Sequence, residues 1–268
     1  MTSKQSKKTA NSSNVPALDK AFLILDYLTA INQPVSASQI ARDLNMARSS
    51  THNLLSAMTN KGVLHKDAYN LFTLGSYLLY WSGKFQSQQD IISLFHETMT
   101  QFPFLMEQTV TLSSLDEQTG EVVFLACHES PAPLGFTFRP GIRVPATFSA
   151  SGKAMLSTFD IETIKTIYAH TMPTALTPYS VKNFEQLEEE LVKVRTNKTS
   201  LDDGQLREGM YCVGTHILDN TGKPIAGVAV SFVKTEYEKK QIETKKALVA
   251  LAILMEQRIG FKKSEPSR

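Results

Sequence analysis

The chain has 268 residues, a formal net charge of +2 and 42% hydrophobic residues, a length for which two domains are expected. No segment is apolar enough for a membrane span, and residues 1–14 form a polar tail unlike a signal peptide. We therefore expect a cytoplasmic protein with no membrane partner. The two cysteines, Cys127 and Cys212, lie far apart without CxxC spacing, so neither a zinc ribbon nor a disulfide framework is expected. We predict no cofactor.

The charge is distributed unevenly along the chain. Up to Gly75 the sequence has eight lysine and arginine residues against four aspartates and no glutamate, whereas the remainder is slightly negative. A basic N-terminal module on a near-neutral body suits phosphate contact by one part of the protein only. The first predicted helix of this module runs from Pro16, a favoured first helical residue, to about Ala30.

The stretch from Ser36 to Lys61 predicts two short helices joined by a tight turn. Ser36 followed by Gln39 is a capping box that starts the first helix, and Asn45 tolerates the left-handed conformation that ends it. The second helix begins near Ala47. Its apolar side follows helical spacing and comprises Ala47, Thr51, Leu54, Leu55 and Met58.

The opposite face of the second helix carries polar side chains of moderate reach, namely Arg48, Ser49, Ser50, His52 and Asn53. A recognition helix has this composition, because its N-terminal residues meet base edges and phosphates while its other face packs on a small core. The solvated face of an ordinary helix would have the same composition. The segment that follows the helix is therefore needed to distinguish the two interpretations. Runs 63–66 and 71–74 around a polar turn predict a hairpin. The hairpin completes a winged helix-turn-helix, with Lys66 and Tyr69 as further DNA-contact candidates on the wing.

The segment after Gly75 predicts a connection between two domains. Tyr77–Trp81 is too apolar for a free linker. We expect a linker helix over 76–86, interrupted at Gly83, that packs against another surface such as a second copy of the chain. A further helix is predicted from about Gln88 to Phe102.

The C-terminal part mixes strands and helices. Strands are predicted over 109–115, 121–127, 134–138, 211–218 and 225–232. Helices are predicted over 151–159, 161–169, 183–195 and 236–259. Antiparallel hairpins together with helices indicate an α+β architecture.

Residues 148–154 form a small-residue loop that opens into a helix. Free backbone N–H groups and the positive end of the helix dipole would suit an anion there. The loop is not a Walker A motif, because Thr147 replaces the leading glycine and Ala154 follows the lysine, and no G-x-S-x-G motif is present. The carboxylate of a small organic acid fits this loop better than a nucleotide does. A plain N-capped helix is the simpler alternative.

A second candidate is the segment Asp202–Gly204, which leads to Cys212. A lone cysteine is usually a packing residue. Cys212 and His216 share a strand face and His128 adjoins Cys127, but no recognisable ligand spacing supports a metal site. No serine–histidine–acid set can be assembled either, so we predict no catalytic and no metal-binding residue.

Three segments of the chain are familiar in their order and spacing. They are the helix pair with residues 46–55, the segment Arg143–Ala154 that ends in Gly-Lys-Ala, and residues 202–231. Together they make the chain, from about Val15 to Ile259, resemble the IclR family of bacterial transcriptional regulators. The second segment is similar to the L-P-x-x-A-x-x-x-G-K-A motif of that family. Asn45 stands where the family often has glycine, a tolerable exchange in a left-handed turn.

The resemblance implies an N-terminal winged helix-turn-helix, a linker helix and a C-terminal GAF-like effector-binding domain with an antiparallel sheet. It also implies a homodimer or a dimer of dimers that binds a palindromic operator in double-stranded DNA and senses a small organic acid. We accordingly expect a disordered tail over 1–14, a DNA-binding domain over 15–75, the linker over 76–86, an effector-binding domain over 87–262 and a tail over 263–268.

By this resemblance, the effector site comprises a small-residue loop, an acid, a cysteine and two strand positions, and to these we add Phe136 as part of an apolar wall. These residues are Phe136, Ser149, Ala150, Ser151, Asp202, Cys212, Ala229 and Ser231. Ala229 replaces a hydroxyl-bearing residue of the family, so one hydrogen bond to the ligand is missing. Phe136, Phe138 and Met210 would favour a larger or aromatic acid over a two-carbon one.

We therefore expect a DNA-binding transcriptional regulator whose operator affinity is controlled by a small organic acid, and not an enzyme. The alternative is an enzyme that processes small acids and uses the helical module for dimerisation. A third interpretation is a regulator that responds to a partner protein and binds no ligand.

Overall fold

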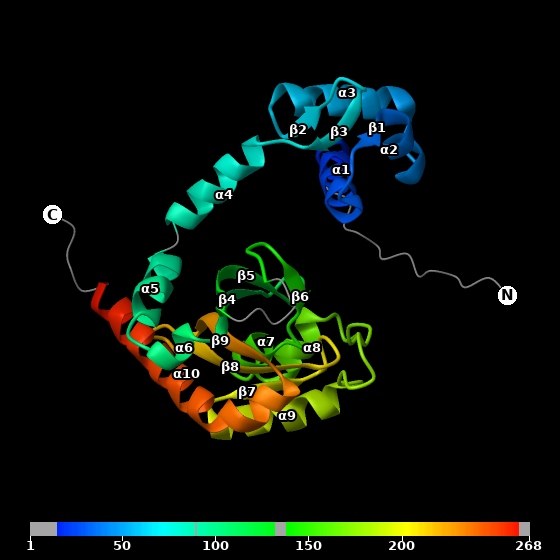
Figure 1. Cartoon of the computed structure of the whole chain (residues 1–268). Coiled ribbons are helices and arrows are strands. Elements are labelled where there is room, and N and C mark those ends of the chain that lie inside the picture. The colour runs from blue at the N-terminus through cyan, green and yellow to red at the C-terminus, as the bar shows by residue number, and fades with distance from the viewer. Residues whose placement is uncertain (1–14, 89, 132–137, 263–268) are drawn as a thin grey trace. The chain divides into compact units, whose positions relative to one another are not determined.

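A computed structural model of the chain describes residues 15–88, 90–131 and 138–262. The chain divides into two compact units, Met1–Gln88 and Gln89–Arg268 (Figure 1). Within the described residues, no helix combines the length and the apolar character needed to cross a bilayer. The predicted strand over 134–138 falls, except for its last residue, outside the described residues, and so does Phe136.

The N-terminal unit begins with helices around a small antiparallel sheet. The helices are α1 (Pro16–Ile31), α2 (Ala37–Asp43) and α3 (Arg48–Asn60), and the strands are β1 (Val35–Ser36), β2 (Leu64–Lys66) and β3 (Leu71–Leu74). The strand order is β1-β3-β2. Strands β2 and β3 form the predicted hairpin, and β1, which the sequence did not predict, pairs with β3. The predicted winged helix-turn-helix is confirmed.

The turn between α2 and α3 forms for the reasons that its residues suggest. The Ser36 Oγ accepts a hydrogen bond from the Gln39 N–H at 3.3 Å, and Asn45 has a left-handed φ of 51°. The Gln39 side chain donates to Asp43 Oδ2 at 2.7 Å, so this bond replaces the second half of the predicted capping box. The helices pack on a core that includes Ile24, Leu28, Ile40, Leu55 and Phe72.

The segment after the wing differs from the prediction in two places. Helix α4 (Tyr77–Gln88) continues through Gly83, so the predicted interruption is wrong: one glycine costs a helix only about 1 kcal/mol. The helix predicted over 88–102 is α5 (Asp90–Met99), which ends earlier, and a short helix that was not predicted, α6 (Pro103–Met106), follows it. The break has a local cause, because the residue before a proline avoids the helical region, and Phe102 has φ −121° and ψ 78°.

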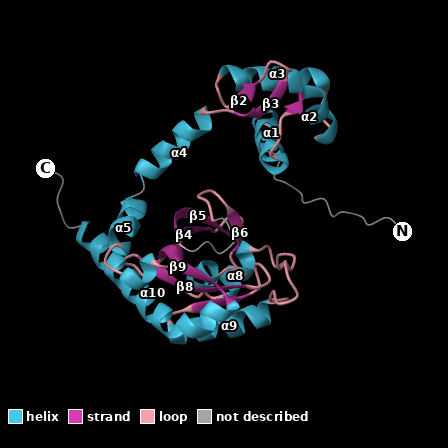
Figure 2. Ribbon diagram, in the orientation of Figure 1, coloured by secondary structure: helices cyan, strands magenta, loops and turns pink. Residues whose placement is uncertain are grey.

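The C-terminal unit is built on an antiparallel sheet of six described strands in the order β6-β5-β4-β9-β8-β7 (Figure 2). The strands are β4 (Thr109–Asp116), β5 (Glu121–His128), β6 (Arg143–Pro145), β7 (Ser200–Asp203), β8 (Met210–Leu218) and β9 (Pro224–Val233). The two edge strands, β6 and β7, were not predicted. They have three and four residues, too few for alternation to stand out in a sequence.

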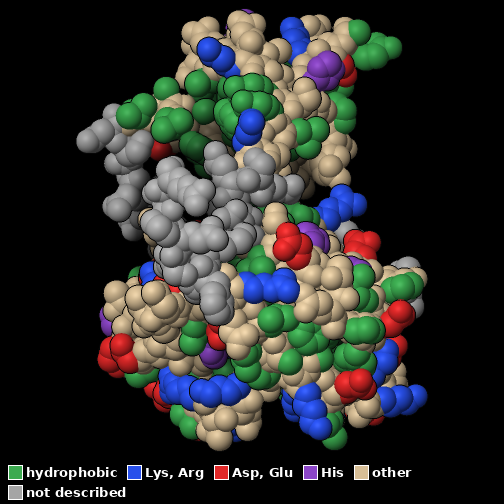
Figure 3. All heavy atoms as spheres, turned by 90° about the vertical axis from the view of Figure 1, so that its left-hand side faces the viewer, with side chains coloured by type: hydrophobic (Ala, Val, Ile, Leu, Met, Phe, Trp, Pro, Cys, Tyr) green, Lys and Arg blue, Asp and Glu red, His purple; other side chains and the backbone are tan. Residues whose placement is uncertain are grey.

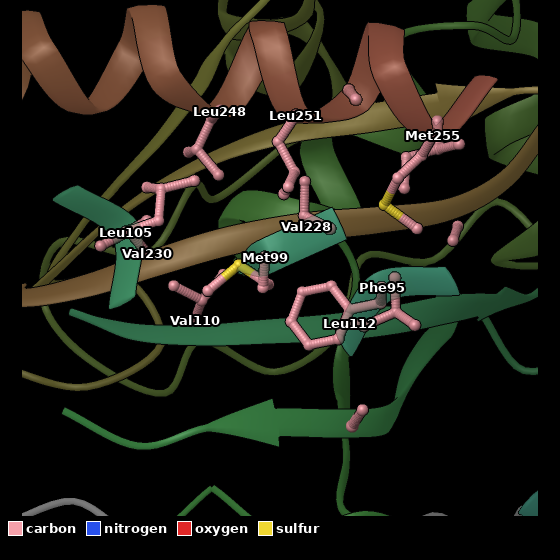
Figure 4. Close-up of a cluster of buried hydrophobic side chains, with 14 of the residues drawn as sticks. Phe95, Met99, Leu105, Val110, Leu112, Val228, Val230, Leu248, Leu251 and Met255 are labelled. Atoms are coloured by element: carbon pink, nitrogen blue, oxygen red, sulfur yellow. The ribbon is translucent and has the colours of Figure 1, made fainter. Parts of the chain in front are cut away.

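Helices cover both faces of this sheet. On one face lie α5, α6 and α10 (Lys234–Lys262), and their side chains interlock with those of β4 and β9 (Figure 4). This core includes Phe95, Met99, Leu105, Val110, Leu112, Val228, Val230, Leu248, Leu251 and Met255. On the other face lie α7 (Ala150–Leu156), α8 (Ile161–Ile167) and α9 (Phe184–Asn197), around a second core. The α+β prediction is confirmed.

Candidate functional site

The residues predicted to contact DNA lie on the outer face of α3. Ser50 is half-buried, and the exposed ones are Arg48, Ser49, His52 and Asn53. On the opposite side, Leu55 and Met58 are buried in the core of the N-terminal unit. Ala47, expected on the buried side, is exposed because it is the N-cap and precedes the helix. The helix is thus anchored along one side and presents polar groups on the other.

The N-terminus of α3 is suited to an anion. Its N-cap is Ala47, whose methyl group cannot accept a hydrogen bond, and its first turn contains no acidic residue. The positive end of the helix dipole is therefore not neutralised by a cap or an acidic side chain of its own first turn. Arg48 adds a full positive charge at the same end. A phosphate group is the natural partner of such a helix end.

The wing presents one aromatic side chain at its tip. Asp67 Oδ1 accepts hydrogen bonds from the N–H groups of Tyr69, at 2.9 Å, and Leu71, at 2.8 Å, which fixes the turn. Tyr69 is 83% exposed. Lys66 is more restrained, since its Nζ lies 5.8 Å from the centroid of the Phe72 ring.

In the C-terminal unit, three of the predicted effector residues form one row across the sheet. Asp202 on β7 pairs with Cys212 on β8, and Cys212 pairs with Ser231 on β9. The Cys212 Sγ lies 3.2 Å from the Ser231 Oγ. All three residues are buried. We call them the Asp202–Cys212–Ser231 row.

Helix α7 lies directly over the neighbouring row, in which Ser200, Gly214 and Ala229 pair. A Cβ atom at Gly214 would be 2.6 Å from the carbonyl carbon of Ala150, so the helix approaches this closely only because the strand has a glycine there. The Ser200 Oγ donates to the Ala150 carbonyl at 2.5 Å. The small-residue loop is thus held against the strands that carry the row, and Ala229 contributes only a methyl group.

The two serines of the loop have partners within the fold. The Ser149 Oγ accepts a hydrogen bond from the Gly152 N–H at 3.0 Å and caps α7. The Ser151 Oγ accepts one from the Ser113 Oγ of β4 at 2.8 Å. The simple N-capped helix, which the sequence offered as the alternative to an anion-binding loop, is therefore present. Its cap is the Ser149 side chain.

Only one of the two carboxylate oxygens of Asp202 has hydrogen-bond partners among the described residues. Its Oδ1 accepts hydrogen bonds from the N–H groups of Gly204, Gln205 and Leu206, at 3.1, 2.7 and 3.3 Å. Its buried Oδ2 has no hydrogen-bond partner among the described residues. Burial raises the pKa of Asp202 to about 6, although the positive charge of Lys153 and the backbone N–H groups act in the opposite direction.

The Cys212 thiol is not set up as a nucleophile. Burial raises the pKa of this thiol above its usual value, and the nearby Asp202 carboxylate acts in the same direction. The thiol therefore stays protonated at neutral pH. A neutral thiol packs and forms weak hydrogen bonds, whereas attack on a substrate requires the thiolate.

A charged network behind the row was not predicted from the sequence. Lys153 is fully buried, and its Nζ lies 2.6 Å from Glu190 Oε2 on α9. The Gln205 Nε2 donates to the other oxygen of Glu190 at 2.8 Å. The Gly-Lys-Ala segment pointed to Lys153, but no sequence pattern links it to Glu190, which is 37 residues away.

The structure describes two of the three residues that were predicted to form an apolar wall of the effector site. Phe138 and Met210 are buried in the same cluster as Cys212, and the Phe138 ring lies 5.9 Å from that of Phe124. Phe136 lies outside the described residues. His216, on the same strand as Cys212, is hydrogen-bonded at Nδ1 to the Ala154 carbonyl oxygen at 3.1 Å, so it ties the strand to α7.

Comparison with known proteins bears on both units. Residues 17–68 match the model of the IclR helix-turn-helix domain, and residues 84–254 match that of the bacterial transcriptional regulator IclR C-terminal domain. The HTH-type transcriptional regulator BhcR of Paracoccus denitrificans is 27% identical over 223 residues, which cover 82% of this chain and 78% of BhcR.

Solved structures agree with these matches. The repressor BlcR of Agrobacterium tumefaciens is 36% identical, with a TM-score of 0.59, over 93% of this chain and 99% of that one. An IclR homologue from Microbacterium hydrocarbonoxydans, complexed with 4-hydroxybenzoate, shares the fold at 19% identity, with a TM-score of 0.75 over 91% of this chain and 98% of that one.

The relatives are transcriptional regulators and not enzymes, which decides against the alternative of a small-acid-processing enzyme. The C-terminal match alone spans more than half of the chain. The chain therefore belongs to the IclR family of bacterial transcriptional regulators, with a DNA-binding helix-turn-helix domain followed by a C-terminal effector domain.

Proposed function

We propose that this regulator acts in the cytoplasm, binds a palindromic operator as a homodimer or a dimer of dimers, and responds to a small organic acid. The acid binds at the Asp202–Cys212–Ser231 row and changes operator affinity. The observation that carries the proposal is the coexistence of an exposed polar face on α3 with a separate buried row of hydrogen-bonding groups. The acid must bind one arrangement of the protein better than the other, and such coupling is typically about 1–3 kcal/mol.

The proposed DNA contacts follow from the chemistry of the exposed face. Arg48 can form paired hydrogen bonds with guanine or bind phosphate, and Asn53 can pair with adenine. Ser49, Ser50 and His52 have the reach for base edges or backbone. Lys66 and Tyr69 on the wing would contact the sugar–phosphate backbone, which positions a protein on DNA without specifying its sequence.

The proposed effector class follows from the groups of the row. The Ser231 hydroxyl and the Cys212 thiol can donate hydrogen bonds to a carboxylate, and Asp202 can do so when protonated. Ala229 contributes no hydroxyl, while Phe138 and Met210 add apolar surface. This combination supports a larger or aromatic acid. The fold match to a protein that holds 4-hydroxybenzoate is consistent with this class.

The proposed homodimer rests on apolar side chains that the N-terminal unit leaves exposed (Figure 3). On α4 they are Leu79, Tyr80, Trp81 and Phe85, and on α1 they are Leu18, Phe22 and Leu23. Large exposed apolar patches mark interaction surfaces. A palindromic operator presents two equal half-sites, so a second copy of this chain is the partner that we propose for these helices.

The direct test is a binding assay with the full chain and the DNA upstream of its own gene, against random duplex of equal length. We expect a preference for the upstream DNA that changes when aromatic and aliphatic acids are added. Equal affinity for both duplexes would contradict the operator proposal. A melting temperature and an operator affinity that no acid changes would favour the interpretation in which a partner protein, and not a ligand, is sensed.

A further inference from the structure

A cavity of about 260 Å³ lies beside β7, the edge strand that carries Asp202. It is lined by residues of β7, α9 and α10, and by Lys153 of α7. Its volume is slightly below the roughly 300–1,000 Å³ of pockets for drug-sized ligands, so it suits a small metabolite. None of the residues predicted for the effector site contributes to this lining, although Leu201 and Asp203, the neighbours of Asp202 on β7, do.

One wall of the cavity contains a buried acceptor without a donor. Gln205 is 3% exposed, and its Nε2 donates to Glu190 Oε1 at 2.8 Å and to Asp203 Oδ1 at 3.1 Å. Carboxylates only accept hydrogen bonds, so the amide orientation is settled: the nitrogen faces both acids. The Gln205 Oε1 is then left without a partner in the part of the chain that the structure describes. A buried acceptor of this kind destabilises the fold until a donor reaches it.

The charges of the lining favour an anion. They are the ammonium groups of Lys153, Lys193 and Lys245 and the carboxylates of Glu190 and Asp203. Glu190 is paired with Lys153, and Asp203 accepts from Gln205. The amide of Gln205 is neutral, so Asp203 keeps its charge, and the lining has three ammonium groups against two carboxylates. Lys193 on α9 and Lys245 on α10, whose Nζ lies 3.4 Å from Gln241 Oε1, carry the positive charge that would attract a negative group.

We propose that this cavity is a second small-molecule site, distinct from the effector row, that binds a hydroxylated carboxylate. The carboxylate lies toward Lys193 and Lys245, and a hydroxyl group donates to Gln205 Oε1. The Gln205 N–H also binds Asp202 Oδ1, so an occupant that moves Gln205 would act on the residue that ends the effector row. The site does not depend on the proposed operator or effector.

The test uses the full chain and three four-carbon probes in titration calorimetry: threonate, butyrate, which lacks the hydroxyls, and erythritol, which lacks the carboxylate. We expect threonate to bind, and butyrate and erythritol to bind at least about tenfold more weakly, because the site needs both groups. Gln205→Met and Lys193→Gln should each weaken threonate binding by about tenfold or more. Lys239→Gln, an exposed change on α10 outside the cavity, should not.

Lys193 is exposed, so its variant keeps the test valid even if Gln205→Met disturbs folding. No threonate binding, or equal binding of butyrate, would overturn the proposal. Threonate binding that both cavity variants leave unchanged would place the ligand elsewhere and would also overturn it. None of these results would affect the outcome of the operator-binding assay, so the two proposals can fail separately.

Discussion

The Sγ atom of Cys212 lies 3.2 Å from the Oγ atom of Ser231 across strands β8 and β9. Asp202 extends this row on β7. Two residues before Ser231 on the same strand, Ala229 faces the start of α7 without a hydroxyl group. The proposed effector site therefore has polar groups along the Asp202–Cys212–Ser231 row and only a methyl group at Ala229 on the next row, which gives Ser231 and Ala229 separate expected effects on ligand binding.

Ser231→Ala should raise the acid concentration needed for a half-maximal change in operator binding by about tenfold, because a hydrogen bond to a charged group is worth about 1.5–3 kcal/mol. The matched change Ala229→Ser adds a hydroxyl one row away and should shift the preference toward smaller, more polar acids. Both effects are measured by titrating acids into a protein–operator complex. If neither variant alters the response, the acid binds elsewhere.

Arg48→Ala should weaken operator binding by at least about tenfold, since Arg48 is an exposed cation at the N-terminus of α3 and contacts of this kind carry about 1–3 kcal/mol. Fluorescence anisotropy at several salt concentrations measures the change. If Arg48 binds phosphate, the slope of log affinity against log salt should fall by about one. Lys61→Ala, at the far end of the same helix, is the control and should have a smaller effect.

Asp202 should make the effector domain less stable as the pH rises from about 4 to about 6. Burial raises its pKa from 3.8 to about 6, so between these values the folded state holds a proton that the unfolded state has lost. The stability that depends on this proton, about 3 kcal/mol, is complete below pH 4 and is lost as the pH rises through 6.

The measurement is the difference in unfolding free energy between the natural chain and Asp202→Asn, in urea, at pH 4 to 7. A difference is needed because burial lowers the pKa of His96 and His216, and these groups stabilise the fold as the pH rises. Asparagine keeps the Oδ1 acceptor for the three N–H groups. A difference that is constant over this range would show that Asp202 titrates normally.

Local patterns in the sequence were sufficient to predict the helices and the turn of the DNA-binding unit. Ser36, Asn45 and Pro16 act through their own backbone neighbours, and the resulting helix and turn positions appear in the structure almost unchanged. The cap at Ser36 and the turn at Asn45 each depend on residues only a few positions away, so residue patterns and local geometry agree there. The short strand β1 was missed because two residues cannot show a period.

The effector unit was predicted less completely because its decisive contacts are distant in sequence. The resemblance pointed to Asp202, Cys212 and Ser231, but only strand pairing places them in one row. The pairing of Lys153 with Glu190 depends on how α7 and α9 pack, and no residue pattern encodes that distance. The orientation of Gln205 and the cavity beside it could not be predicted from the sequence either.

Glu190→Gln should destabilise the effector unit by about 3 kcal/mol, because it leaves the fully buried ammonium of Lys153 without its counter-charge, and breaking a buried pair costs about 3–5 kcal/mol. Lys153→Met combined with Glu190→Gln should recover part of this loss, since no charge is then buried. Urea unfolding of the two variants and of Lys153→Met completes a double-mutant cycle. Additive losses would show that the pair contributes no mutual stabilisation.

Gly214→Ala should be among the most damaging single-methyl additions in the described part of the chain. The added Cβ would lie 2.6 Å from the Ala150 carbonyl carbon and 2.7 Å from the Ser151 nitrogen, and both are backbone atoms that cannot rotate away. Overpacking of this kind typically costs about 1–3 kcal/mol, and here it would also push α7 off the strands that carry the Asp202–Cys212–Ser231 row. Gly83→Ala is the matched control: its Cβ would meet nothing within 4 Å, and it lies inside α4, so it should stabilise the chain by up to about 1 kcal/mol. Thermal unfolding should therefore shift in opposite directions for the two variants, and a Gly214→Ala protein as stable as the natural chain would show that α7 does not approach the sheet as closely as described.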